Sequence, residues 1–183
     1  MDKNSLTDRL SNIKLVISDV DGVFTDGSLY IGQNGEEFKR FNVLDGAGIA
    51  LMKAAGIPMA IISGRKSGVT LYRMKELGLD EHLYQGNLAK IEPYQKIKTD
   101  FNLDDAEILY IGDDLVDIPL IRRAGVGVAV ANAPQIVKEA ANYVTQSLGG
   151  HGAVREVIEI LLNAQDKFTM ALDKLSKHTY KDS

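Results

Sequence analysis

Lys14-Leu-Val-Ile-Ser-Asp-Val-Asp-Gly-Val-Phe-Thr-Asp-Gly27 is the stretch of sequence that decides the fold. Residues 15–17 form an apolar run typical of a buried parallel strand, and Asp19 and Asp21 follow it in a turn that contains Gly22. Ligands of open parallel sheets bind beyond the carboxyl ends of the strands. Two carboxylates there are costly to desolvate without a cation, which indicates a divalent metal. The alternative is an Asx-rich turn that only ends the strand.

The length and composition of the chain are those of one globular domain, and we expect residues 1–183 to form it. The 183 residues are 45% hydrophobic and 25% charged. The net charge of -4 and the lack of a basic block give no reason to expect a nucleic-acid partner. The absence of cysteine excludes disulfides and thiolate catalysis. No apolar run has the pattern of a signal peptide or membrane span, so we expect no membrane association and a cytoplasmic location.

Strand-like and helical patterns alternate along most of the chain. Alternation of this kind predicts an α/β fold, a parallel sheet with helices on both faces. The strand-like runs lie at residues 59–62, 108–111 and 126–130, and the helical patterns lie at residues 44–55, 69–77, 88–101, 116–123 and 134–141.

Two segments stand outside this alternation. Residues 28–41 contain Asn34-Gly35 between strand-like runs, which predicts a β-hairpin. A lone two-stranded hairpin is marginal in water, so its apolar residues Ile31 and Phe38 indicate contact with a neighbouring subunit. Residues 163–183 read as a mobile C-terminal tail with weak amphipathic character.

Three polar clusters directly follow strand-like runs. Asp19 and Asp21 form the first cluster, Ser63 begins the second, and Asp113 with Asp114 forms the third. The carboxyl ends of parallel strands share one crevice, so these distant segments are expected to converge. Each cluster also has a structural interpretation, since aspartate often caps a helix and serine often occupies a turn.

Together these residues are suited to phosphoryl transfer. Asp19, Asp21 and Asp113 supply hard oxygen ligands for Mg²⁺. One aspartate would attack phosphorus, and another would protonate the leaving oxygen and later activate water. Ser63 would donate to a phosphoryl oxygen, and Lys90 would balance its charge, unless it is only a solvated helix lysine.

The polar segments resemble, in chain order, the four motifs of the haloacid dehalogenase superfamily of phosphotransferases. The matching segments are Asp19-Val-Asp21-Gly-Val, Ile-Ser63-Gly-Arg65, Lys90, and Gly112-Asp113-Asp114 with Asp117. The resemblance implies that Asp19 is the nucleophile and Asp21 the general acid/base, which also gives a backbone carbonyl to Mg²⁺. It further implies that Ser63 and Lys90 bind the phosphoryl group and that Asp113 ligates the metal. Asp114 or Asp117 would act through water or position the others.

The spacing of the motifs limits what lies between them. Residues 20–62 separate the first motif from the second, and residues 64–89 separate the second from Lys90. Neither interval is long enough for an independent domain. We therefore expect a Rossmann-like fold with a hairpin insertion and no separate cap domain.

Further local strings resemble the 3-deoxy-D-manno-octulosonate 8-phosphate phosphatases. This resemblance implies a homotetramer whose hairpins meet in a central barrel, a tail that covers a neighbour's site, and a role in lipopolysaccharide biosynthesis. It also implies an acidic sugar phosphate as substrate, whose carboxylate the Ser63-Gly64-Arg65 turn would meet through Arg65. The strings are residues 21–27, 39–46, 85–90 and 149–157.

One residue departs from this pattern, and alternatives therefore stay open. Many family members have a basic residue where this chain has Leu44. Another acidic sugar phosphate, such as an N-acylneuraminate 9-phosphate, is the nearest alternative substrate. A non-catalytic oligomerisation module is a further alternative, although a scaffold has no need for so many clustered carboxylates.

Overall fold

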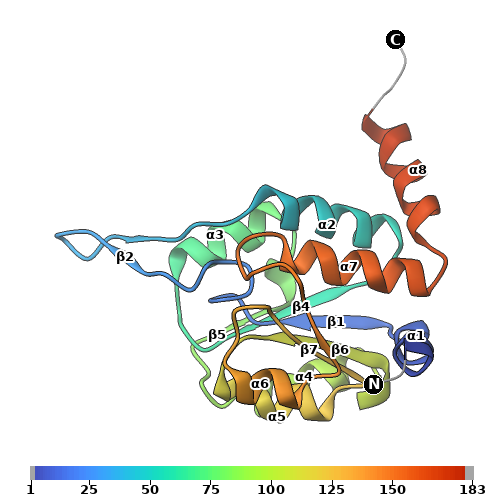
Figure 1. Cartoon of the computed structure of the whole chain (residues 1–183). Helices are drawn as coiled ribbons and strands as arrows, with labels where there is room; N and C mark the ends of the chain where they lie inside the picture. The colour runs from blue at the N-terminus through green and yellow to red at the C-terminus, as the bar shows by residue number, and fades with distance from the viewer. Residues whose placement is uncertain (1–2, 180–183) are drawn as a thin grey trace.

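The chain folds around a six-stranded parallel sheet. The computed structural model describes residues 3–179, and the strands are ordered β5-β4-β1-β6-β7-β8 (Figure 1). The central strand β1 pairs on both sides, with Ser18 opposite Ile61 and Ile111. The predicted parallel α/β architecture is therefore confirmed. The strands are β1 (Leu15–Ser18), β4 (Met59–Ser63), β5 (Leu83–Gln85), β6 (Ile108–Gly112), β7 (Val126–Ala129) and β8 (Tyr143–Val144).

Helices cover both faces of the sheet, as the alternating pattern predicted. Helices α2 (Val43–Ala54), α3 (Gly68–Glu76) and α7 (Ala153–Ala164) lie on one face (Figure 1). The other face carries α4 (Ile91–Asp100), α5 (Ile118–Arg123) and α6 (Gln135–Ala140). Helix α1 (Lys3–Ser11) precedes β1, and three short 3-10 helices complete the connections: η1 (Asp80–His82), η2 (Asp105–Glu107) and η3 (Leu115–Asp117).

Burial explains why the strands have continuous apolar runs. Every residue of β1, β4 and β6 is buried, because helices exclude water from both faces of the sheet. Polar residues appear where these strands end, at Ser18, Ser63 and just after Gly112. Within residues 3–179, no helix combines the length and apolar character needed to cross a membrane.

The predicted hairpin projects from the body of the molecule (Figure 1). Its strands β2 (Tyr30–Ile31) and β3 (Glu37–Phe38) are shorter than the predicted runs and pair antiparallel, with Tyr30 opposite Phe38. The side chains of Ile31 and Phe38 are exposed, at 69% and 62%. The chain between β1 and β4 consists of the aspartate loop, this hairpin and α2, as the short spacing predicted.

Further differences from the sequence-based expectation concern the bounds of two helices and one short strand. The helix predicted at residues 116–123 begins as η3 and continues as α5 from Ile118. Helix α4 begins at Ile91 rather than at residue 88, because residues 88–90 form a tight turn in which the Lys90 amide donates to the Leu88 carbonyl. Strand β8 was not predicted, since two residues are too short for a periodic pattern.

The C-terminal helix α8 (Phe168–Thr179) packs against α2 with Ala171 buried. It lies on the side of the molecule opposite the hairpin (Figure 1). Mobility of residues 163–183 stays a prediction, and residues 180–183 lie outside the described part of the chain.

Candidate active site

The three predicted polar clusters converge on one pocket. It lies beyond the carboxyl ends of β1, β4 and β6, where a parallel sheet places its ligands. Loops that are far apart in the sequence supply its walls. The described residues that line it are Asp19, Asp21, Gly27, Gly64, Arg65, Lys90, Asp113, Asp114 and Val116.

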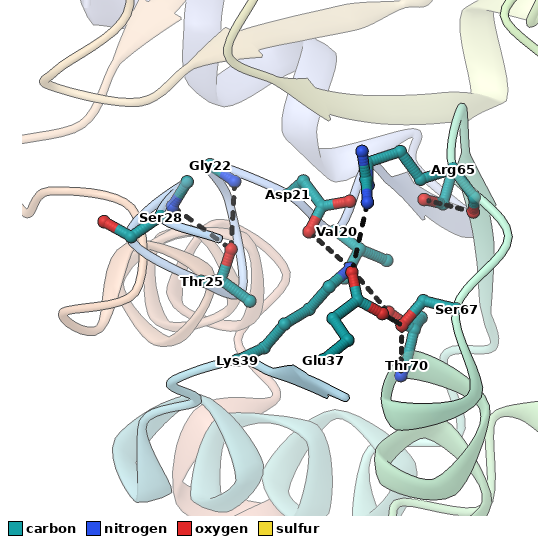
Figure 2. A network of polar contacts seen from close by, with 12 residues as sticks. Val20, Asp21, Gly22, Thr25, Ser28, Glu37, Lys39, Arg65, Ser67 and Thr70 are labelled. Atoms are coloured by element: carbon teal, nitrogen blue, oxygen red, sulfur yellow. Dashed lines mark hydrogen bonds and ion pairs between the residues drawn. The ribbon is translucent and has the colours of Figure 1, made fainter. Parts of the chain in front are cut away.

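The loop after β1 is fixed by its own hydrogen bonds. The Val20 amide donates to Asp19 Oδ1 at 2.6 Å, which orients the carboxylate. The buried Thr25 Oγ1 accepts from the amides of Gly22 and Gly27, each at 3.2 Å (Figure 2). Gly22 has a φ of +86°, a conformation that favours glycine. The chain turns sharply there, next to Asp113 of the third cluster. The loop therefore holds both aspartates at the edge of the pocket.

Lys90 lies inside the site rather than in solvent. It is 2% exposed, and its Nζ is 2.6 Å from Asp19 Oδ2 and 2.7 Å from Asp117 Oδ1. Burial alone would lower the pKa of Lys90, but the two carboxylates outweigh burial and raise that pKa above its ordinary value. The interpretation of Lys90 as a solvated helix lysine is therefore wrong.

Asp117 occupies the centre of the polar network. Its Oδ1 accepts from Tyr110 Oη at 2.6 Å, and its Oδ2 accepts from the amides of Asp113 and Asp114, each at 3.1 Å. The residue is fully buried, so these partners satisfy both of its oxygens. Asp114 instead turns outward and caps Leu115 with its Oδ1. Of the two aspartates that the motif left open, Asp117 is the one placed to position Asp113.

The site has the charge and the donors that suit a divalent cation. Carboxylate oxygens of Asp19, Asp113 and Asp117 lie within 4.8 Å of one another, and Lys90 supplies a single positive charge among them. The buried Asp21 Oδ2 has no hydrogen-bond partner. Hard, negatively charged oxygen donors in excess of the available positive charge are the set that Mg²⁺ prefers.

The pKa values of the carboxyl groups express the same excess of negative charge. Burial raises the pKa of Asp19 to about 7, with Lys90 opposing the shift and Asp117 adding to it. Burial also raises the pKa of Asp113 to about 8, and the neighbouring Asp19 and Asp117 raise it further. A bound cation would favour the ionised forms of both groups.

The second cluster lines another wall of the pocket. Ser63 ends β4, is buried, and donates from Oγ to the Arg65 carbonyl at 3.2 Å. Gly64 and Arg65 line the pocket, whereas the buried Ser63 does not. Leu44 is half exposed in the first turn of α2 and does not line the pocket.

Comparison with known proteins relates this chain to a family of sugar phosphatases. Residues 82–158 match the haloacid dehalogenase-like hydrolases. The chain is 45% identical over 159 residues to the 3-deoxy-D-manno-octulosonate 8-phosphate phosphatase of Yersinia pestis. This match covers 87% of this chain and 84% of that relative. This chain belongs to the family of 3-deoxy-D-manno-octulosonate 8-phosphate phosphatases.

Solved structures of 3-deoxy-D-manno-octulosonate 8-phosphate phosphatases share the fold over nearly the whole chain. The enzyme from Moraxella catarrhalis, in complex with magnesium ion, phosphate ion and a KDO molecule, has a TM-score of 0.91 and 37% identity, covering 95% of this chain and 99% of that one. A cobalt-bound enzyme from Haemophilus influenzae has a TM-score of 0.84 and 41% identity, covering 88% and 94%.

Two residues make contacts around the site that the sequence did not identify, namely Asp45 and Lys39. Asp45 is buried, and its Oδ1 accepts from the Arg155 amide at 3.1 Å, which joins α2 to the start of α7. Lys39 reaches from the hairpin to Asp21. The alternation of Glu37, Phe38 and Lys39 was a signal for this second contact, since alternate strand residues point to opposite faces.

Proposed function

We propose that this enzyme hydrolyses 3-deoxy-D-manno-octulosonate 8-phosphate to 3-deoxy-D-manno-octulosonate and phosphate, with Mg²⁺, as a step of lipopolysaccharide biosynthesis. The observation that carries the proposal is the contact of Lys90 Nζ with Asp19 Oδ2 at 2.6 Å, inside a pocket lined by Asp21 and Asp113. This arrangement occurs in a chain whose relatives bear that enzyme's name.

Asp19 is the proposed nucleophile. Lys90 and the Val20 amide hold one oxygen each, so the carboxylate is oriented before substrate binds. Its attack on phosphorus forms an aspartyl phosphate, and the bond between phosphorus and the sugar oxygen breaks. Asp21 gives a proton to the departing sugar oxygen. It then takes a proton from the water that attacks the aspartyl phosphate, which restores Asp19 and releases phosphate.

The remaining pocket residues bind and orient. Asp19, Asp113 and the main-chain carbonyl of Asp21 would hold Mg²⁺, which would supply positive charge to neutralise the phosphoryl oxygens. Lys90 contacts the phosphoryl group together with Ser63, whose hydroxyl must turn away from the Arg65 carbonyl to do so. Gly64 and Arg65 border the substrate, and the Arg65 guanidinium is the proposed partner of the sugar carboxylate.

The exposed hairpin supports the proposed homotetramer. Ile31 and Phe38 lie at its tip and edge in solvent, which is costly for a monomer. Replacing both with aspartate should lower the molar mass measured by light scattering, and an unchanged mass would remove the hairpin from the interface. Replacing Leu71, an exposed residue of α3, with aspartate is the matched control.

The cytoplasm is the compartment that we propose. A sugar phosphate carries charge that prevents it from crossing a bilayer unaided, so its phosphatase must share the compartment in which it is made.

Another acidic sugar phosphate, such as an N-acylneuraminate 9-phosphate, would use the same chemistry. The phosphate released from each ester, with Mg²⁺ and with EDTA, tests the proposal. Metal-dependent release that favours the octulosonate ester supports it. Preference for the neuraminate ester would support the same mechanism with a different acidic sugar phosphate as substrate. Leu44 would then be the first residue to replace. No release from any ester would contradict the proposed function.

A further inference from the structure

We propose that Lys39 is a positioning residue for Asp21, holding the carboxylate by Oδ1 so that Oδ2 exchanges protons. This inference rests on the proposed function, which gives Asp21 the acid/base role. Lys39 belongs to the hairpin segment, and Asp21 to the loop after β1. The contact therefore links the hairpin insertion to the chemical centre of the enzyme.

Lys39 is buried in a way that calls for a specific partner. Its side chain has 0% exposed surface, and lysine is rarely buried fully unless it is paired. Nζ lies 2.7 Å from Asp21 Oδ1 and donates to Thr70 Oγ1 at 3.1 Å (Figure 2). A desolvated ammonium is costly, so the ion pair with Asp21 is what makes this position tolerable.

Glu37 forms a second, longer ion pair with Lys39. Its Oε1 is 3.9 Å from Lys39 Nζ and 3.3 Å from Arg65 Nη2, and its Oε2 accepts from Ser67 Oγ at 2.5 Å (Figure 2). Ser67 is also the N-cap of α3, where it accepts from the Thr70 amide. These contacts anchor the β3 segment to the start of α3, so Lys39 approaches Asp21 from a fixed base.

The two oxygens of Asp21 have different surroundings. Oδ1 is held by Lys39, whereas the buried Oδ2 has no hydrogen-bond partner, and the residue lines the pocket. Oδ2 is the oxygen that Lys39 leaves unpaired, and in this assignment it gives a proton to the departing sugar oxygen and then takes one from water. The contribution of Lys39 is to fix the carboxylate before reaction, which removes an orientational cost from the transition state.

The leaving group of the substrate provides a sharp test. An alkyl ester needs its leaving oxygen protonated, whereas p-nitrophenyl phosphate releases p-nitrophenolate, which is a stable anion without a proton. In Lys39→Met, kcat/KM for the octulosonate ester should fall about a hundredfold. The fall for p-nitrophenyl phosphate should stay below about tenfold. Asp21→Asn should give the same pattern, and Lys96→Met, which removes an exposed lysine, should change neither value.

A second variant separates positioning from folding. The chain has no cysteine, so Lys39→Cys introduces its only thiol. Alkylation of the unfolded variant with 2-bromoethylamine, followed by refolding, rebuilds an ammonium side chain of nearly the same length. We expect the alkylated protein to regain most of the lost kcat/KM, with the parent enzyme taken through the same refolding as reference.

The outcomes are distinguishable from failure of the proposed function. If the parent enzyme releases no phosphate from the octulosonate ester, the proposed function fails. If the parent enzyme is active, a loss in Lys39→Met that is equal for both esters, or no loss at all, overturns the role of Lys39. An alkylated variant that refolds, shown by its circular dichroism, but stays as slow as unmodified Lys39→Cys overturns it as well.

Discussion

Gly22 lies so close to Asp113 that a β-carbon at position 22 would be 2.0 Å from Asp113 Oδ2. The loop after β1 and the loop after β6 therefore meet with no room for a side chain. The contact explains why the aspartate loop carries glycine at this point, beyond the requirement of its φ of +86°.

Gly22→Ala should therefore displace the Asp113 carboxylate and weaken Mg²⁺ binding by about tenfold or more. The Mg²⁺ concentration that gives half of the thermal stabilisation measures this effect. Gly35→Ala is the matched control, because Gly35 has φ of +87° and open space around it. Equal Mg²⁺ binding in both variants would show that the contact with Asp113 has no role in binding the metal.

Asp19→Asn should abolish turnover and leave the fold intact. The neutral amide is a poor nucleophile, so we expect phosphate release to fall by about a thousandfold or more. Asp19 is 6% exposed and burial disfavours its charge, so its neutral replacement should not lower the melting temperature. Asp104→Asn, at an exposed capping residue, is the control for both measurements. Turnover near that of the parent enzyme would exclude the aspartyl phosphate.

Lys90→Met should destabilise the protein as well as inactivate it. The change leaves Asp19 and Asp117 buried without their shared cation, at a cost of about 3–5 kcal/mol in the free energy of unfolding. Lys96→Met removes an exposed ion pair with Asp100 and should cost less than about 1 kcal/mol. Urea denaturation measures both values, and similar costs would contradict the buried ion triad.

Stabilisation by Mg²⁺ should grow with pH. The pKa values of Asp19 and Asp113 are raised in the folded protein to about 7 and about 8, from 3.8. Without metal, their contribution to stability is complete below about pH 4 and is lost as the pH rises through 7 to 8. Mg²⁺ competes with these protons, so the difference in melting temperature between Mg²⁺ and EDTA should be larger at about pH 8 than at about pH 5.

Asp113→Asn is the control for this pH dependence. The variant lacks one of the two titrating carboxylates, so its Mg²⁺-dependent shift should be smaller and should vary less with pH. A shift that is the same at both pH values in the parent enzyme would contradict the coupling of metal and protons.

The sequence predicted what depends on local patterns. Strand β1 and the position of Asp19 follow from an apolar run that ends in carboxylates, and the convergence with Asp113 follows from parallel topology. The motif order supplied the position of Lys90, and its ion pairs with Asp19 and Asp117 agree with that expectation.

What the sequence did not predict depends on contacts between distant segments. The hydrogen bond from the Arg155 amide to Asp45 joins residues 110 positions apart, and no periodicity records such a pairing. Lys39 lies 18 positions from Asp21, and the two meet only because the hairpin segment folds back onto the loop after β1. The central position of Asp117 likewise required the geometry of the loop after β6.

The hairpin places two duties on neighbouring residues of one short segment, with Phe38 in solvent and Lys39 against Asp21. If the hairpins meet as proposed, the fixed position of the Asp21 carboxylate depends on the subunits staying associated. Specific activity should then fall on dilution, and a point mutation at the subunit contact should behave as a kinetic mutation in the site. Selection on assembly and selection on turnover would act on the same few codons.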